Sequence, residues 1–368
     1  MDALVIGTGG ARGWPEDGCR CASCMRARAA GERRAPGRVL VDDRLDVVPG
    51  LPPRPATGPS SAAPLHVERL PGGFDITTLD GSRLLLAAGP GEVPEPQPGT
   101  SPYDLALLDL LGDPAQLGRL RASGLVHGRT AVTALYTDHR VSSPAEMARR
   151  CAFWRAHQAQ DGQLISGPSA ADCPAASLRP HRTLIIGGAR SGKSTEAELR
   201  LAAEPRVTYV AAGPFPPGPK DSEWTGPDGE PDTEWARRVA IHRARRPSWW
   251  RTVETLDLAG ILREETGALL IDGIGTWLAA VLEEAGMWSE AAAAGVAVQA
   301  RIDELVETWR QTLALVVAVT DQVGSGLVPA YPAGRLFRDQ LGWLNQRIAA
   351  ESELNLQVVA GRVTSPPG

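Results

Sequence analysis

The chain has 368 residues, of which 43% are hydrophobic, and its formal net charge is −5. A chain of this length is expected to form about two domains, and the acidic balance disfavours nucleic acid as the main partner. The opening MDALVIGTGG lacks the basic and apolar regions of a signal peptide. No apolar run approaches the ~20 residues of a membrane span, so we expect a cytoplasmic protein without membrane spans.

The first half of the chain, residues 1–165, is rich in short apolar runs separated by turn signals. Helix-like stretches are expected at 115–123 and 144–157, and the proline-rich segments 49–64 and 89–99 are expected to be loops. These features predict a sheet-rich α/β or α+β domain. Besides ALVIGTGG at 3–10, the runs typical of strands are RVLVDD, FDITTLDG, SRLLLAAG, YDLALLDLLG and AVTALYT.

Three of the five cysteines lie close together near the start of the chain, at Cys19, Cys21 and Cys24. An odd number of cysteines with this C-x-C-x2-C spacing suits a metal site better than a disulfide framework. Reactive or buried free thiols are the alternative interpretation.

The stretch GTGGARGWPEDGCRCASC at 7–24 resembles the start of metallo-β-lactamase-fold hydrolases, particularly their phosphodiesterase-like branch. The resemblance extends over roughly 1–165 and is weak beyond the first 45 residues. It implies a structural Zn²⁺ held by Cys19, Cys21, Cys24 and a distant histidine, for which His139 in TDHR is the candidate. Three thiolates and one imidazole make a closed tetrahedral zinc site. An ordinary loop histidine is the alternative for His139.

The hydrolases of that fold hold two catalytic metals with the motif H-x-H-x-D-H, which this sequence does not contain. The four histidines of this half, His66, His127, His139 and His157, are isolated from one another. We therefore expect a degenerate metallo-β-lactamase-like domain without catalytic activity, with a structural or regulatory role.

The second half, residues 181–368, follows a small, polar, proline-bearing segment at 166–180 that reads as an interdomain linker. Strands that are apolar throughout and separated by helices indicate a parallel sheet covered on both faces, which is a doubly wound α/β domain. Ligands of such a domain bind beyond the carboxyl ends of its strands. The apolar runs are TLIIG, RVTYVAAG, ALLID, LALVVAVT and LQVVAG.

The segment GGARSGKS at 187–194 fits the phosphate-loop pattern G-x-x-x-x-G-K-[ST] between an apolar strand and a helix-forming segment. Gly187 and Gly192 would let backbone N–H groups approach phosphate oxygens, Lys193 would reach the β- and γ-phosphates, and Ser194 would bind Mg²⁺. Lys193 is one of only two lysines among 38 basic residues, which favours this interpretation over a glycine-rich turn without a ligand. The predicted loop consists of Gly187, Gly188, Ala189, Arg190, Ser191, Gly192, Lys193 and Ser194.

Two further features of this half are candidates for a metal-binding or catalytic role. Asp272 ends the run ALLID, where a carboxylate that binds the nucleotide's metal is expected, although an aspartate that caps a strand–loop junction is the alternative. The segment ARRVAIHRARRPSWW at 236–250 surrounds His242 with five arginines. By itself this stretch favours a solvated basic helix face, and we keep that interpretation for Arg237 and Arg238.

The ordered motifs over about 181–368 resemble the bifunctional adenosylcobinamide kinase / adenosylcobinamide-phosphate guanylyltransferase family of cobalamin biosynthesis. The resemblance implies phosphorylation of the aminopropanol arm of adenosylcobinamide with ATP or GTP. It then implies transfer of GMP from GTP through a GMP–histidine intermediate, giving adenosyl-GDP-cobinamide. The motifs are GGARSGKSTEAE, RVTYVAAG, RVAIHRARRPSWWRTVE, VTDQVGSGLVP and RLFRDQLGWLNQRIA.

The family pattern H-x-x-x-R-P-x-x-W-x-T-x-E places the GMP-carrying histidine at His242. A neutral imidazole can attack the α-phosphorus of GTP, and histidine is partly neutral at about pH 7. Arg243, Arg245 and Arg246 would neutralise the triphosphate and the pyrophosphate leaving group. The remaining pattern positions and implied nucleotide contacts are Pro247, Trp250, Thr252, Glu254, Ala244, Asp272 and the backbone of Ala211, Ala212 and Gly213. The family is typically oligomeric, which implies a homo-oligomer.

The sequence departs from the family in two places. Family members commonly read T-N-E-V-G where this chain has TDQVG, so Asp321 and Gln322 exchange which position carries the charge. The insertion at 215–235 precedes the His242 segment and is either a lid or, as we favour, a surface loop. Two other classes of function stay open. One is a phosphate-loop kinase or NTPase for another small molecule, and the other is a nucleotide-binding regulatory protein without turnover.

Overall fold

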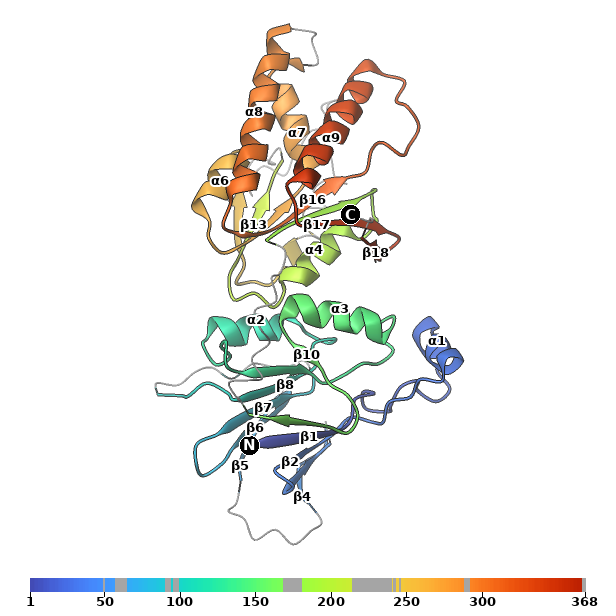
Figure 1. The fold of residues 1–368 in the computed structure, drawn as a ribbon, viewed down its shortest axis with the longest axis vertical. Helices are drawn as coiled ribbons and strands as arrows, with labels where there is room; N and C mark the ends of the chain where they lie inside the picture. Colours follow the sequence, from blue (N-terminus) through green and yellow to red (C-terminus); the bar gives the residue numbers. More distant parts are fainter. Residues whose placement is uncertain are drawn as a thin grey trace. The chain divides into compact units, whose positions relative to one another are not determined.

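The structure, a computed structural model, divides into two compact units, Met1–Arg179 with Ala202–Pro205, and Pro180–Leu201 with Arg206–Gly368. Figure 1 shows the elements of each unit. Among the described residues, no helix has the length and apolar character needed to cross a membrane. The structure describes residues 1–48, 50–56, 65–89, 94, 99–167, 181–213, 240, 243–244, 246–287 and 292–365.

The first unit is built on two β-sheets. The five-stranded sheet is antiparallel throughout, and the six-stranded sheet is parallel from β7 to β10 and antiparallel from β5 to β7. In spatial order the first has β11 (Gln163–Ser166), β1 (Asp2–Gly7), β2 (Arg38–Val41), β3 (Leu45–Val47) and β4 (Arg54–Pro55). The second has β10 (His157–Gln158), β9 (Ala131–Ala134), β8 (Leu105–Leu108), β7 (Arg83–Ala87), β6 (Gly73–Thr77) and β5 (His66–Leu70).

The apolar runs of this unit pack between its two sheets. Val5 and Val39 from one sheet and Leu84, Leu86 and Leu105 from the other belong to one buried cluster. Every residue of β8 is buried, so its second face is covered too, and Figure 1 shows helices on that side. These are α2 (Ala115–Ala122) and α3 (Pro144–Trp154). Helix α1 (Ala22–Ala30) instead contacts the loop before α3, where Ser23 Oγ donates to the Val141 carbonyl oxygen. The predicted sheet-rich α/β character of this half is therefore confirmed.

The helix expected over 144–157 is shorter than predicted. It begins where the Ser143 side chain accepts a hydrogen bond from the Glu146 N–H, a standard N-cap. It ends at Trp154 because Arg155 adopts a left-handed conformation with φ 53°. His157 consequently belongs to strand β10, which pairs with β9.

The second unit has one seven-stranded sheet in which all neighbours are parallel except β17 and β18. Its order is β14 (Arg251–Glu254), β13 (Val207–Ala211), β15 (Ala268–Asp272), β16 (Leu315–Asp321), β12 (Arg182–Gly187), β17 (Leu354–Val359) and β18 (Arg362–Thr364). All five predicted apolar strands are present. β14 was not predicted, because this edge strand has the sequence RTVE and three of its four residues are exposed.

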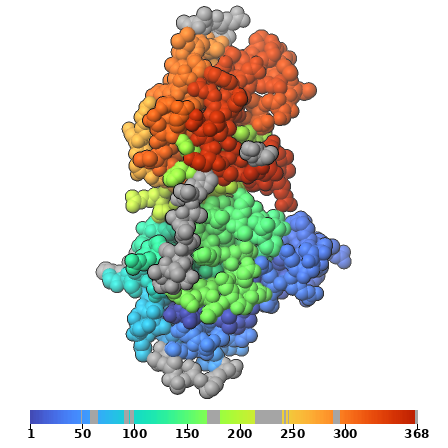
Figure 2. Space-filling view, viewed as in Figure 1, coloured from blue at the N-terminus to red at the C-terminus, as the bar shows by residue number. Residues whose placement is uncertain are grey.

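Helices cover both faces of this sheet. Leu184 and Ile185 are consecutive in β12 and belong to two different buried clusters, one on each face. One cluster packs against α4 (Lys193–Leu201), and the other packs against α6 (Leu258–Glu264), α7 (Ile274–Glu284), α8 (Ala292–Gln311) and α9 (Pro332–Ala350). In the space-filling view, α8 and α9 form much of the visible orange and red surface of this unit (Figure 2). The predicted doubly wound phosphate-loop fold is confirmed.

Candidate functional site

Most of the residues predicted to contact the nucleotide lie at one edge of the parallel sheet. The carboxyl ends of parallel strands meet at the same edge, where ligands of this fold class bind. Gly187 at the end of β12 stands opposite Asp321 at the end of β16. Ala211 at the end of β13 stands opposite both Asp272 and Glu254, the last residues of β15 and β14.

The phosphate loop turns tightly between β12 and α4. A Cβ atom on Gly187 would lie 2.4 Å from Ser191 Oγ and 2.8 Å from the Val358 carbonyl oxygen, so a side chain does not fit there. Gly192 has φ +97°, a conformation that favours glycine. The Gly361 N–H donates to the Ser191 carbonyl oxygen at 2.7 Å and ties the loop to the β17–β18 turn. The start of α4 at Lys193 then presents backbone N–H groups to an anion.

Lys193 is held by two partners at this edge. Its ammonium Nζ lies 3.0 Å from Asp321 Oδ1 and donates a hydrogen bond to the Gly188 carbonyl oxygen at 3.1 Å. Asp321 is one of the two residues of TDQVG at which we expected a departure from the family pattern, and its carboxylate pairs with the loop lysine. A phosphate group that reaches Lys193 would therefore compete with Asp321.

Asp272 is hydrogen-bonded through both of its carboxylate oxygens. Ser194 Oγ donates to Oδ1 at 3.3 Å, and the Tyr209 hydroxyl donates to Oδ2 at 2.5 Å. The serine and aspartate oxygens are hard ligands, close enough for one Mg²⁺ ion to contact both at about 2.1 Å. The donor set of Ser194 and Asp272 therefore fits Mg²⁺.

Tyr209 is a site residue that the sequence interpretation missed. It is 3% exposed, and burial together with the Asp272 carboxylate raises its pKa, so the hydroxyl stays a neutral donor. The signal was present in RVTYVAAG, because a tyrosine in a buried strand needs a partner for its hydroxyl. The partner is supplied by the neighbouring strand, which sequence alone does not reveal.

The motif that follows His242 lines a cavity of about 390 Å³. Arg243 Nη2 donates to Glu254 Oε1 at 2.8 Å, and Arg246 Nη1 donates to Thr252 Oγ1 at 3.4 Å. The lining consists of Arg243, Arg246, Pro247, Ser248, Trp250, Thr252 and Glu254, of which all but Ser248 were predicted. His242 and Arg245 lie outside the described residues, and so do Arg237, Arg238 and the insertion at 215–235.

Tyr209 connects an arginine of this cavity to the Asp272 carboxylate. The Arg246 guanidinium carbon lies 3.3 Å from the centroid of the Tyr209 ring, a cation–π contact. The hydroxyl of the same ring donates to Asp272. One side chain thus contacts both Asp272 and an arginine that lines the cavity.

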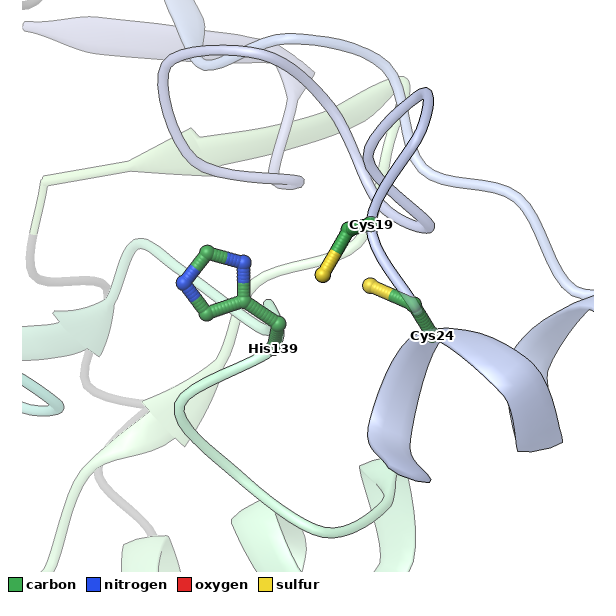
Figure 3. A group of neighbouring side chains, drawn as sticks. All are labelled: Cys19, Cys24 and His139. Carbon is green, nitrogen blue, oxygen red and sulfur yellow. The ribbon is translucent and has the colours of Figure 1, made fainter. Parts of the chain in front are cut away.

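A second group of side chains in the first unit has the composition of a metal site. The ligand atoms of Cys19, Cys24 and His139 all lie within 4.8 Å of one another (Figure 3). Burial raises the pKa of Cys24 to about 11. Cys21 is exposed and is not part of this group, although its Sγ accepts a hydrogen bond from the Cys24 N–H at 3.4 Å and caps α1.

His139 reaches the cysteines through contacts between α1 and the loop after β9. Trp14 Nε1 donates to Ser23 Oγ at 3.2 Å, and Ser23 Oγ donates to the Val141 carbonyl oxygen at 2.7 Å. Glu16 Oε2 lies 3.3 Å from His139 Nδ1. Thiols and an imidazole in this arrangement fit Zn²⁺.

Comparisons with known proteins address the second half of the chain. The family described as cobinamide kinase / cobinamide phosphate guanyltransferase matches residues 183–365. The bifunctional adenosylcobalamin biosynthesis protein CobP of Pseudomonas aeruginosa is 38% identical over 189 residues, 49% of this chain and 94% of that protein. CobU of Salmonella typhimurium is 34% identical over 190 residues, 48% of this chain and 95% of CobU. CobU of Escherichia coli is 32% identical over 188 residues, 48% of this chain and 95% of that protein.

Proposed function

The chain belongs to the cobinamide kinase / cobinamide phosphate guanyltransferase family of cobalamin biosynthesis, and we propose that its second unit carries out both reactions at the edge of one sheet. It would phosphorylate adenosylcobinamide and then transfer GMP from GTP to the new phosphate. The observation that carries the proposal is the position of Tyr209, whose hydroxyl donates to Asp272 and whose ring contacts Arg246 of the arginine-lined cavity. Both reactions use a nucleoside triphosphate. We expect the protein to be cytoplasmic and to form a homo-oligomer.

In the kinase step, the phosphate loop would hold the triphosphate of ATP or GTP. Backbone N–H groups at the start of α4 and the Lys193 ammonium would bind the β- and γ-phosphates. Ser194 and Asp272 would hold Mg²⁺, which neutralises charge on the phosphate oxygens when bound. The substrate hydroxyl oxygen forms a bond to the γ-phosphorus and loses its proton. The bond to the β-phosphate oxygen breaks, and the nucleoside diphosphate leaves.

In the transfer step, a ring nitrogen of His242 would attack the α-phosphorus of GTP. A phosphorus–nitrogen bond forms, the bond between the α-phosphorus and the bridging oxygen breaks, and pyrophosphate leaves. A phosphate oxygen of adenosylcobinamide phosphate then attacks the same phosphorus and releases the histidine. Arg243, Arg245 and Arg246 would stabilise the charge on the leaving group, and Glu254 would orient Arg243.

For the first unit we propose a structural zinc site in a domain without hydrolytic activity. Cys19, Cys24 and His139 would supply three ligands, and a rotation of the exposed Cys21 side chain would supply the fourth. The grouping of Figure 3 supports this proposal. The resemblance of the domain to metallo-β-lactamase folds also stays a proposal.

The two reactions can be separated with two substitutions. Lys193→Ala should stop the phosphorylation of adenosylcobinamide but leave GMP transfer to adenosylcobinamide phosphate measurable. His242→Ala should allow phosphorylation and stop GMP transfer. His157→Ala, an exposed histidine of the first unit, serves as the matched control. Products are separated by chromatography and identified by mass. If His242→Ala still made adenosyl-GDP-cobinamide, the assigned carrier would be wrong, and hydrolysis without transfer to cobinamides would favour another phosphate-loop enzyme.

A further inference from the structure

The first unit contains a cavity of about 560 Å³ that the proposed reactions do not use. This volume lies within the ~300–1,000 Å³ typical of small-molecule sites. The loops after β1, β8 and β9 line it, and its walls include the apolar side chains of Leu51 and Phe74. Arg69 and Arg140 also line it, so the cavity combines an apolar wall with guanidinium groups.

Arg140 lies between two buried carboxylates at this cavity. Its Nη1 donates to Asp109 Oδ2 at 2.7 Å, and its Nη2 donates to Asp138 Oδ2 at 2.7 Å. The side chains of Asp109 and Asp138 are 5% and 9% exposed, whereas that of Arg140 is 35% exposed. The two carboxylates therefore fix the guanidinium from two sides, while part of the guanidinium stays open to the cavity.

The backbone around this ion-pair network approaches it closely. A Cβ atom on Gly10, which has φ +72°, would lie 2.9 Å from Asp138 Oδ2. A Cβ atom on Gly112 would lie 3.0 Å from Asp109 Oδ2 and 3.2 Å from Arg140 Nη1. Glycine at both positions leaves room for the network, so the guanidinium is held by its surroundings as well as by its partners.

The carboxylates at this cavity already have partners, Glu16 with Arg12 and the two aspartates with Arg140 and backbone N–H groups. Asp109 Oδ1 already accepts from the Leu111 and Gly112 N–H groups, and Asp138 Oδ1 accepts from the Arg140 N–H. An arginine carries five N–H groups, so Nη1 and Nη2 of Arg140 each keep a second hydrogen. Arg69 is exposed and has no ion-pair partner among the residues that the structure describes. A ligand that pairs with the open N–H groups of Arg140 and Arg69 must bring acceptors.

We propose that this cavity binds a small organic anion, whose phosphate or carboxylate group contacts Arg140 and Arg69 and whose apolar body packs against Leu51 and Phe74. The planar guanidinium fork matches both kinds of oxyanion. Both aspartates already accept hydrogen bonds, so the open N–H groups of Arg140 and Arg69 are the groups left to bind a ligand. The first unit then acts as a ligand-binding domain, independently of the reactions proposed for the second unit.

The test uses the full chain with Lys193→Ala, which removes the phosphate-loop lysine as a competing anion site. Calorimetric titrations use phenyl phosphate and phenylacetate, which separate the two kinds of anion, and phenol, which keeps the apolar body without the charge. We expect saturable binding of at least one anion and not of phenol. Arg69→Met should weaken the affinity for the anion about fivefold or more, because a charge-assisted hydrogen bond is lost. Arg129→Met, an exposed arginine outside the cavity, should leave the affinity unchanged.

Arg140→Lys keeps the charge but loses the fork, and should also weaken binding while near-ultraviolet circular dichroism confirms the fold. Arg69→Met keeps the experiment decisive if Arg140→Lys disturbs folding, since Arg69 is not part of the ion-pair network. Binding of phenyl phosphate alone assigns a phosphate ligand, and binding of phenylacetate alone assigns a carboxylate ligand. The proposal is overturned if neither anion binds saturably, if phenol binds as well as they do, or if Arg69→Met leaves their affinity unchanged.

Discussion

Substitution of Tyr209 by phenylalanine tests the proposed link between the phosphate-loop region and the arginine-lined cavity. The change removes only the hydroxyl that donates to Asp272 Oδ2 at 2.5 Å and keeps the ring beneath Arg246. Loss of a partner that orients a metal ligand typically lowers metal affinity or activity about tenfold or more. We therefore expect the Mg²⁺ concentration for half-maximal phosphoryl transfer to rise about tenfold in Tyr209→Phe, with GMP transfer at saturating Mg²⁺ nearly unchanged.

The assay measures both product-forming rates across a Mg²⁺ titration. Tyr209→Leu removes the ring as well and should also raise the KM for GTP in the transfer step, because Arg246 loses a cation–π contact worth about 0.5–2 kcal/mol. Tyr331→Phe alters a tyrosine that is 79% exposed and serves as the control. An unchanged Mg²⁺ dependence in Tyr209→Phe would refute the role given to this hydroxyl.

Three further predictions concern the loop, the zinc site and pH. Gly192→Ala should lower phosphoryl transfer at least about tenfold, because alanine is strained at φ +97°, whereas Gly342→Ala, in open space on α9, should not. Cys24→Ser should abolish zinc binding, measured by metal analysis, and lower the melting temperature of the first unit, whereas Cys151→Ser should keep the metal. Burial raises the pKa of the Tyr136 hydroxyl in the folded protein. As pH rises above about 10, the unfolded chain therefore loses the hydroxyl proton before the folded protein does, and the free energy of unfolding should fall. Urea unfolding should show that Tyr136→Phe removes up to about 1.4 kcal/mol per pH unit of this slope, and an unaltered slope would contradict the assignment.

The sequence revealed most of the second unit's sheet, because five of its strands are continuous apolar runs between helices. It did not reveal β14, since the exposed edge strand RTVE has no apolar pattern. It also could not show that Asp321 pairs with Lys193, because β12 and β16 are neighbours only through the strand order of the sheet.

Residues brought together by tertiary contacts were the hardest to predict. The hydroxyl of Tyr209 meets Asp272 across two paired strands, and no spacing in the sequence records that contact. The resemblance implied His139 as the partner of the cysteines, but the contacts that bring it to Cys19 and Cys24 became visible only in the structure. In the first unit, the sequence indicated that a metal-binding catalytic motif was missing. The guanidinium of Arg140 between two buried carboxylates became visible only in the structure.

The most direct test of the central claim is the capture of the covalent GMP–enzyme intermediate. The full chain is incubated with GTP labelled at the α-phosphorus and Mg²⁺, without a cobinamide acceptor, and the precipitated protein is counted after acid and after alkali. A phosphorus–nitrogen bond to histidine predicts label that is lost in acid and kept in alkali, present in wild type and His157→Ala and absent from His242→Ala. Unlabelled wild-type protein, or label that persists in His242→Ala, would contradict the account.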